Sequence, residues 1–344
     1  MAKYTFGMTH GTPRRSFIKA TGIAVSGGVL TAATGSAGAT SGWVERSTPT
    51  STQLSAVSYA LDGAYAVGHG GYVLEREGGT WTTVTDDGPS GNGNDLSGSD
   101  ATDDGQRLWV VGASGEIGEY DVASESFLGV VSIGDDSDLS GPDDYTDNLR
   151  DVAVTGLAGD ANVYVTDDSG YVTYSLDNGE TWSYTTPGSG STIPAIGMHS
   201  DTDGHCSDTN QSVFADDGEN WSKIGVDDRD ENFYGLDSNA DDNVWVCGNE
   251  GLVLEYDGSW SAESLGNVTL RDIQVTADRT SGLTVGSGGC VFRRSGDWVE
   301  ANTPTEENLK GVVRGDPDAL DFDPAVDDTP DVAVGASGTI IEHA

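Results

Sequence analysis

Basic residues are scarce in this chain. Its 344 residues contain 16 Lys and Arg against 57 Asp and Glu, a formal net charge of −41. Four of the basic residues (Lys3, Arg14, Arg15 and Lys19) precede position 40, where no acidic residue occurs. The remaining 305 residues therefore hold 12 basic and 57 acidic residues, a net charge of about −45. Such a surface repels phosphates, which argues against a nucleic-acid partner.

Lysine is almost missing after residue 39, where only Lys223 and Lys310 occur. Carboxylates are spread over every loop instead. In molar salt, repulsion between charges is screened within about 3 Å, and dense carboxylates keep a protein hydrated. The composition resembles that of secreted haloarchaeal proteins, so the charge describes the habitat rather than a partner.

Cysteine and histidine are also few. The three cysteines, Cys206, Cys247 and Cys290, are an odd number for an exported protein. Cys247 aligns with apolar positions of other repeats, which predicts a buried thiol, although a disulfide between Cys206 and Cys247 remains an alternative. The histidines show no metal-ligand spacing; His199 and His205 leave a transition-metal site open as the less favoured alternative. We expect no cofactor.

No apolar run is long enough to span a bilayer. The longest, a weakly apolar run over residues 20–33, follows the pair Arg14-Arg15 and precedes Ala37-Gly38-Ala39. Paired arginines, an apolar run and a small-residue cleavage site resemble a twin-arginine export signal. We therefore expect a signal peptide at residues 1–39, a mature domain at residues 40–344, and a protein released outside the cell or held at its surface.

An aromatic residue recurs with a period near forty. It occupies positions 81, 127, 182, 221, 260 and 298, with steps of 46, 55, 39, 39 and 38 residues. A seventh, Trp43, lies 38 residues before Trp81, whereas the last repeat ends at Ala344 without one. A period of this length with strand-like content is typical of a propeller.

Each repeat contains four short strands, and no stretch has a convincing helical period. The sequence predicts an all-β fold, a seven-bladed β-propeller of four-stranded blades. Its ring is closed by the N-terminal strand, which completes the last blade. We expect Trp43-Val44-Glu45 to pair with residues 338–342 and so complete the last blade, which removes the free sheet edges. The fourth repeat is the weakest, because Pro194 interrupts its first strand.

The clearest copy of the repeated turn reads S-x-D-x-G-x-T-W, formed by Ser175, Asp177, Gly179, Thr181 and Trp182. With the strand patterns L-R-D-V and V-W-V-x-G, this unit resembles the photosystem II assembly/stability factor propellers over about residues 42–344. These are a branch of the BNR/Asp-box repeat superfamily, which also contains sialidases and sortilin-like domains. The resemblance implies a non-enzymatic propeller that binds partner proteins, and an Asp-box that stabilises the fold.

Sialidase-like chemistry is the alternative from another class. It needs an arginine triad for a substrate carboxylate, a tyrosine nucleophile with a supporting glutamate, and an acidic acid/base. Only ten arginines follow residue 39, and the early F/Y-R-I-P signature is missing. We therefore expect no enzymatic activity and no catalytic residues; a glycan-binding or sialidase-like glycoside hydrolase propeller remains the alternative.

Three basic residues occupy the same place in the first strands of three repeats: Arg150, Arg271 and Lys310. Tyr234, Ser55, Ser97 and Pro194 hold that place in the others. Because first strands line the channel of a propeller, these positions form a ring near one channel mouth. We predict a partner-binding site there, as the arginine-rich patch of the resembled family implies, for an unknown protein or a surface glycan. The alternative is local pairing, Arg150 with Asp151 and Arg271 with Asp272. We expect a monomer.

Two longer acidic connections lie at residues 135–147 and 316–331. Clustered carboxylates suit calcium, but neither segment has the spaced D-x-[DN]-x-[DN]-G pattern. We expect solvated loops and no metal site.

Overall fold

The structure, a computed structural model, describes residues 42–130, 147–188, 190–218, 220–226, 229–315, 322, 324–326 and 328–343. The expected signal peptide and most of the two acidic connections lie outside these residues.

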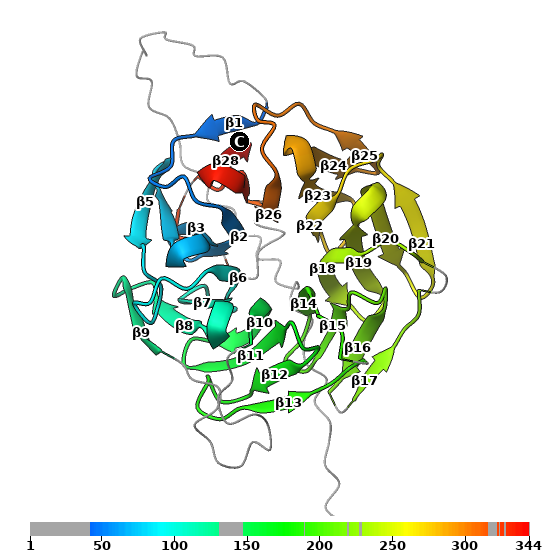
Figure 1. The fold of residues 1–344 in the computed structure, drawn as a ribbon, viewed down its shortest axis with the longest axis horizontal. Coiled ribbons are helices and arrows are strands. Elements are labelled where there is room, and N and C mark those ends of the chain that lie inside the picture. The colour runs from blue at the N-terminus through cyan, green and yellow to red at the C-terminus, as the bar shows by residue number, and fades with distance from the viewer. Residues whose placement is uncertain are drawn as a thin grey trace, which may run out of the picture.

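The described chain forms seven antiparallel sheets of four strands each, which confirms the predicted propeller (Figure 1). We number the blades in chain order. Blade 1 comprises β2 (Leu54–Ala60), β3 (Gly63–Gly68), β4 (Val73–Glu77) and β5 (Thr80–Thr85). Blade 2 comprises β6 (Leu96–Ala101), β7 (Arg107–Gly112), β8 (Ile117–Asp121) and β9 (Ser126–Val130). Blade 3 comprises β10 (Leu149–Leu157), β11 (Asp160–Asp167), β12 (Val172–Ser175) and β13 (Ser183–Thr185).

The remaining blades repeat the pattern. Blade 4 comprises β14 (Ala195–Met198), β15 (Asp203–Ser207), β16 (Val213–Asp217) and β17 (Trp221–Lys223). Blade 5 comprises β18 (Phe233–Ala240), β19 (Asn243–Gly248), β20 (Leu252–Tyr256) and β21 (Trp260–Ser264). Blade 6 comprises β22 (Leu270–Val275), β23 (Ser281–Gly286), β24 (Val291–Ser295) and β25 (Asp297–Glu300). Blade 7 comprises β26 (Leu309–Val313), β27 (Asp331–Gly335), β28 (Ile340–His343) and β1 (Val44–Arg46).

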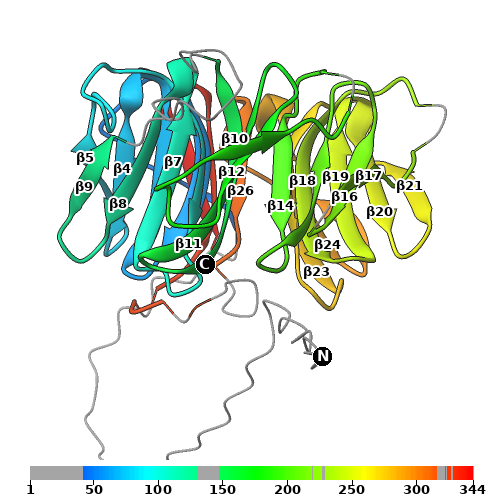
Figure 2. The ribbon, with the colours of Figure 1, turned by 90° about the horizontal axis from the view of Figure 1, so that it is seen from below.

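The first strand of each blade lies nearest the ring axis and the last strand lies at the rim (Figure 1). Seen from the side, the strands run between the two faces of a thick disc (Figure 2). Because every first strand begins at the same face, residues at equivalent places in the repeats lie at the same depth of the channel.

The ring is closed by β1, which is the outermost strand of blade 7. Val44, Glu45 and Arg46 pair with Glu342, Ile341 and Ile340 in antiparallel register. The predicted closure is confirmed, with the paired segment one residue further along than Trp43–Glu45. Trp43 is itself buried, and it packs in the apolar cluster between blades 6 and 7.

Seven apolar clusters fill the seven interfaces between adjacent blades. Large side chains of the second strands contribute to most of them, at one equivalent position: Tyr65, Trp109, Tyr164 and Trp245. Blade 4 has His205 at that position, and His205 is only 1% exposed. The irregular fourth repeat therefore still forms a complete blade, but its interface with blade 5 contains polar groups.

The Val-Gly pattern has a steric cause. A Cβ placed on Gly112 would lie 2.1 Å from the carbonyl oxygen of Asp95, which precedes the first strand of the same blade. The 3-10 turns η1 (His69–Gly71), η2 (Ala113–Gly115), η3 (Asn249–Gly251), η4 (Ser287–Gly289) and η6 (Ala336–Gly338) follow such glycines. The first N–H of each turn donates to the carbonyl that precedes the first strand, for example that of Ala113 to the Asp95 carbonyl at 2.8 Å. These turns therefore lie at the face where the first strands begin.

The Asp-box side chains bond to their own hairpin. Ser175 donates to Asp177 Oδ1 at 2.7 Å, and the Gly179 N–H donates to Ser175 Oγ at 2.8 Å. Thr181 donates through both its N–H and its hydroxyl to Asp177, at 2.8 and 2.6 Å. Trp182 donates from Nε1 to the Gly179 carbonyl at 3.1 Å. The motif occupies the connection between the two outer strands of blade 3, away from the channel.

Cys206, Cys247 and Cys290 are all buried free thiols, so the alternative of a disulfide between Cys206 and Cys247 is wrong. Their strand positions differ by one residue: Cys206 pairs with Ile196, whereas Cys247 pairs with Gly235, the equivalent of Ala195. Because successive side chains of a strand point to opposite faces, the two thiols face different blade interfaces. Burial raises the pKa of Cys290 to about 11 and that of Cys206 well above its usual value.

Candidate functional site

The face where the first strands begin carries the predicted basic ring. The residues at the shared position, in blade order, are Ser55, Ser97, Arg150, Pro194, Tyr234, Arg271 and Lys310. Tyr234, Arg271 and Lys310 thus come from three consecutive blades, 5, 6 and 7. We call this face the mouth face and these three residues the mouth cluster.

Arg271 lies over the ring of Tyr234, with its guanidinium carbon 4.2 Å from the ring centroid. A cation above an aromatic face is attracted by the ring quadrupole, by about 0.5–1 kcal/mol at an exposed site. Within the described part of the chain, Arg271 has no ion pair with a carboxylate. Tyr234 therefore fixes the guanidinium in place without neutralising its charge.

Lys310 is the next member of the mouth cluster. It is half-buried, and its ammonium forms no ion pair with the residues that the structure describes. Burial, and then the positive charge of Arg271, lower the pKa of Lys310 below its usual value. The two cations are thus close enough to repel each other, and a carboxylate between them would relieve that repulsion.

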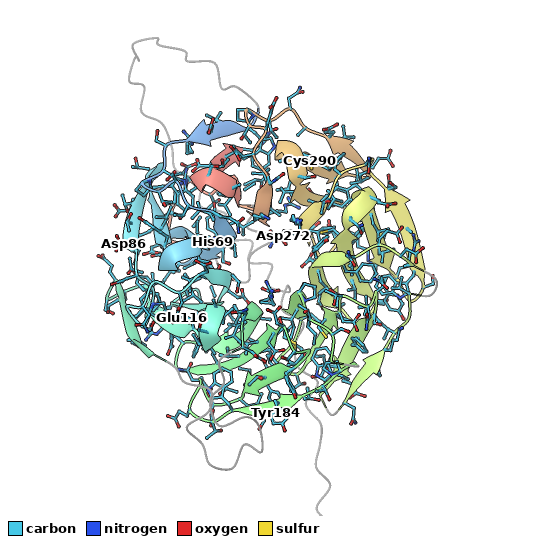
Figure 3. All side chains as sticks on the ribbon, in the orientation of Figure 1. His69, Asp86, Glu116, Tyr184, Asp272 and Cys290 are labelled. Atoms are coloured by element: carbon cyan, nitrogen blue, oxygen red, sulfur yellow. The ribbon has the colours of Figure 1, made fainter. Side chains whose placement is uncertain are left out.

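Arg150 differs from the mouth cluster, because its Nε forms an ion pair with Asp168 Oδ1. Asp168 follows β11, the strand that pairs with β10. The alternative of local pairing is therefore right for Arg150, although the partner is Asp168 and not Asp151, and wrong for Arg271, which does not pair with Asp272. Asp151 and Asp272 bond to backbone N–H groups instead, and Figure 3 shows Asp272 on the channel side of its blade.

Carboxylates on the first strands connect neighbouring blades, a role that the sequence did not reveal. Each accepts the N–H of a residue in the first strand of the next blade. The bonds run from Val154 to Asp100 (2.7 Å), Ile196 to Asp151 (3.0 Å), Val275 to Asp237 (2.7 Å) and Val312 to Asp272 (2.8 Å). The repeated L-R-D pattern was the available signal, since its aspartate lies beside the channel in two blades.

Two of these aspartates have strongly altered acidity. Enclosure by the neighbouring strands raises the pKa of Asp151 to about 8 and that of Asp272 to about 7, against the N–H groups that favour the ionised form. Ionising either carboxyl therefore costs free energy in the folded state. The contribution of these two aspartates to the stability of the blade contacts depends on pH for that reason.

A cavity of about 220 Å³ lies inside the ring. First strands of all seven blades line it, and its polar groups include Asp100, Asp151, Asp272 and His199. No residue of the mouth cluster lines this cavity. The mouth cluster and the acidic interior of the channel are therefore two separate environments.

A polar network occupies the interface of blades 4 and 5, where sequence reasoning noted only His199 and His205. Ser238 Oγ lies 3.0 Å from His199 Nδ1 and 2.8 Å from His205 Nδ1. His199 Nε2 lies 3.0 Å from Asp241 Oδ1, and the two imidazoles stack with centroids 5.5 Å apart. An ionised Asp241 only accepts, so His199 carries its proton on Nε2, and its Nδ1 accepts a hydrogen bond from the Ser238 hydroxyl. Ser238 then accepts from His205 Nδ1.

This network resembles a Ser-His-Asp arrangement in composition, but Ser238 is only 7% exposed and holds both imidazoles. His205 Nε2 is buried without a hydrogen-bond partner among the described residues. Burial, and then the charge of His199, lower the pKa of His205 to about 3. His205 is therefore neutral at ordinary pH. The network's role is structural, because it joins blade 4 to blade 5 by hydrogen bonds.

The described residues contain no group of three or more His, Cys, Asp or Glu that could hold a metal ion. His199 and His205 are bonded to Ser238 and Asp241 instead, and this arrangement is not a metal-binding group. The calcium alternative concerned residues 135–147 and 316–331. Most of these residues lie outside the part of the chain that the structure describes.

Comparisons with known proteins give the fold. No protein-family model matches this chain, and no curated protein sequence matches it. A solved structure of YCF48 bound to D1 peptide is similar, with a TM-score of 0.64 and 14% identity, covering 88% of this chain and 94% of that one. YCF48 from Cyanidioschyzon merolae has a TM-score of 0.63 and 12% identity, covering 88% and 98%. The WD40 β-propeller domain of Doa1 has a TM-score of 0.64 and 14% identity, covering 88% and 97%.

At these identities the likeness establishes the propeller fold. Within the described ranges, no helix is long and apolar enough to cross a membrane.

Proposed function

We propose that this protein is an exported, non-enzymatic propeller that binds an acidic segment of a partner protein at the mouth cluster. One observation carries the proposal: Arg271 and Lys310 adjoin each other on a strongly acidic chain, yet neither pairs with a described carboxylate. Most other arginines are paired, among them Arg46, Arg76, Arg107 and Arg150.

The contact with the partner is short-range. At molar salt, charges separated by more than about 3 Å are screened, so long-range steering contributes little. Affinity then comes from direct, partly desolvated bonds, for which an arginine fork and a carboxylate are well matched. Tyr234 holds the Arg271 side chain in place, which reduces the entropy lost when a carboxylate binds.

Propellers of this fold support the kind of ligand proposed, since YCF48 has been solved with a bound peptide. The paired arginines Arg14-Arg15 and the following apolar run support export in the folded state. Replacing both arginines by lysine should then leave the precursor in the cytoplasm; unchanged secretion contradicts the export part of the proposal.

A carboxylated glycan is the competing ligand. A sialidase-like site needs three arginines around the substrate carboxylate, whereas the seven positions of the ring hold two arginines and one lysine. Of the two arginines, Arg150 is paired with Asp168. Tyr234 lies beneath Arg271 rather than standing free as a nucleophile. These features favour the protein segment.

The decisive experiment compares the wild type with the double variant Arg271→Ala/Lys310→Ala. Both are used in molar salt to capture proteins from the cell surface of the source organism, and binding of the captured partner is then measured by calorimetry. The double variant should lose the partner while its thermal unfolding stays near that of the wild type. Arg279→Gln, which removes a charge in the turn between β22 and β23 on the opposite face, should bind normally.

Two results would overturn the proposal. The double variant could retain its partner, which would place the function on another face. Alternatively, the wild type could bind carboxylated glycans on an array and no acidic protein segment, which would establish the competing ligand.

A further inference from the structure

Three tripeptides in this chain match the acceptor pattern for N-linked glycosylation, Asn-x-Ser/Thr with x other than proline. They are Asn210-Gln211-Ser212, Asn220-Trp221-Ser222 and Asn267-Val268-Thr269. In an exported protein such a tripeptide marks a surface site for a bulky, solubilising sugar. The structure separates the three by their surroundings.

The tripeptide at Asn267 lies in the connection between β21 and β22, outside any strand. Asn267 is exposed, and neither its amide nor the Thr269 hydroxyl forms a hydrogen bond within the described part of the chain. A Cβ on the preceding Gly266 would meet no atom within 4 Å, so this side of the connection faces open space, whereas its backbone packs against Gly251 of η3. The base of the connection is fixed, because the Gly251 N–H donates to the Val268 carbonyl at 2.6 Å.

The tripeptide at Asn210 is held in place. Its amide Nδ2 donates to Ser191 Oγ at 2.5 Å, and its backbone N–H donates to Asp208 Oδ1 at 2.9 Å. Ser212 is only 6% exposed, and its N–H also donates to Asp208, at 2.8 Å. An enzyme that grips both the asparagine and the hydroxyl residue therefore cannot reach this tripeptide in the folded protein.

The tripeptide at Asn220 is intermediate. Asn220 and Ser222 are exposed, but Trp221 and Ser222 belong to β17, where they pair with Asp216 and Ala215. To enter an enzyme site, this tripeptide must leave the sheet, and each hydrogen bond given up costs about 0.5–1.5 kcal/mol. Asn210 is also exposed and outside the strands, but its amide is bonded to Ser191 and Ser212 is buried. Of the three tripeptides, that of Asn267 is therefore the one that lies outside the strands and has neither a bonded asparagine amide nor a buried hydroxyl residue.

The order of folding and export decides whether the accessibility of the three tripeptides matters. A chain glycosylated while unfolded offers all three tripeptides, whereas a chain exported after folding offers only those accessible in the fold. The inference rests on the export part of the proposed function, because the twin-arginine route carries folded proteins. We propose that Asn267 is the site of an N-linked glycan and that Asn210 and Asn220 stay unmodified.

The reaction needs a sugar donor, an oligosaccharide linked through phosphate to a membrane lipid, and an N-oligosaccharyltransferase. The bond between the anomeric carbon and the phosphate oxygen breaks as a bond from Asn267 Nδ2 to that carbon forms. The amide loses one proton, and the lipid phosphate leaves with the bonding electron pair. No oxidant or reductant takes part.

The glycan would stand on the mouth face. Asn267 precedes Arg271 by four residues, and its connection is bonded to η3, which lies at that face. A sugar there would add bulk to the same face as the mouth cluster.

The test measures the intact mass and the glycopeptides of protein recovered from the surface of a host that uses twin-arginine export and glycosylates its own surface proteins. The wild type should show a glycan mass increment that Asn267→Gln and Thr269→Ala abolish. Thr269→Ser, which keeps the hydroxyl, should retain it, as should Asn210→Gln and Asn220→Gln. An exported protein of unmodified mass, or an increment that survives Asn267→Gln, overturns the inference.

A second arm separates this inference from export. Purified folded protein is incubated with membranes that contain the transferase and its lipid-linked donor, whether or not the cell exports the protein. Modification at Asn267 alone supports the inference even if export fails, and no modification there overturns it. The same chain unfolded in urea and diluted into the assay should also gain sugar at Asn210; equal modification of Asn210 in the folded protein overturns the accessibility argument.

Discussion

Arg76 and Glu342 form a buried ion pair across the closure of the ring, with Arg76 Nε 2.8 Å from Glu342 Oε1. Arg76 is 5% exposed and Glu342 is 1% exposed. Glu342 also accepts from Trp81 Nε1 at 2.9 Å and from Arg46 Nε at 2.8 Å. One carboxylate of the last strand thus binds β1, β4 and β5, which joins both chain ends to blade 1.

Replacing Glu342 by Gln should destabilise the ring strongly, because the buried Arg76 would lose its buried ionic partner and keep only the exposed Asp328. Loss of one member of a buried ion pair costs about 3–5 kcal/mol of unfolding free energy. The free energy is measured by denaturant unfolding in molar salt. Glu231→Gln, which removes the partner of the more exposed Arg229, should cost at most about 1 kcal/mol. Similar losses for the two variants would contradict a special role of the closure.

Deleting residues 40–48 should lower the stability of the whole propeller, because β28 would become an open edge and Glu342 would lose Arg46. Thermal unfolding followed by circular dichroism measures the loss. A synthetic peptide of residues 42–49 added to the truncated protein should restore part of it, since the peptide can pair with β28. A truncated protein that melts with the wild type, peptide or no peptide, would show that closure contributes nothing.

His205 should make the protein acid-sensitive. Its pKa is about 3 in the fold, below the ordinary value of 6.5, so the unfolded chain binds the proton more readily. The stability that its neutral form provides is complete above pH 6.5 and is lost as pH falls towards 3. His205→Phe, which supplies an aromatic ring as other blades do, should flatten this part of the stability profile. The exposed His69→Gln variant should follow the wild type, and a wild-type slope in His205→Phe would refute the assignment.

Asp151 and Asp272 should act in the opposite direction. Their pKa values, about 8 and about 7, lie above the value of 3.8 for an unhindered carboxyl. The folded state therefore binds protons more tightly, so the stability that these two groups contribute is complete below pH 3.8, falls as pH rises above it, and is lost once pH has passed 7 and 8. The double variant Asp151→Asn/Asp272→Asn should lose this slope, because an amide does not titrate.

The same double variant should also be less stable at neutral pH, by about 1–3 kcal/mol for each backbone N–H left without an acceptor. Denaturant unfolding across the pH series gives both quantities. Asp86→Asn, an exposed change at the rim labelled in Figure 3, is the matched control and should leave the profile unchanged. A slope that persists in the double variant would assign it to other carboxyl groups.

The sequence by itself determined the architecture. The period of the aromatic residues and the surplus strand at Trp43 required seven blades and a closure between the chain ends, because a propeller blade needs four strands and an open ring leaves edges unpaired. The glycine of each Val-Gly pair lies against the backbone that precedes the first strand of the same blade. Because this contact is made within one repeat, the repeated sequence pattern also reveals it. Even the basic ring followed from the repeat, since equivalent positions lie at equal depth.

Only the tertiary structure decided the partners of these residues. Arg150 and Arg271 share one position, yet one meets Asp168 and the other meets Tyr234, because the partner comes from whichever strand or blade adjoins that position. Glu342 is one of 57 acidic residues in the sequence, and closure of the ring alone brings Arg46, Arg76 and Trp81 onto it. Spacing along the chain encodes the strands, whereas the pairing of charges depends on distances between segments almost 300 residues apart.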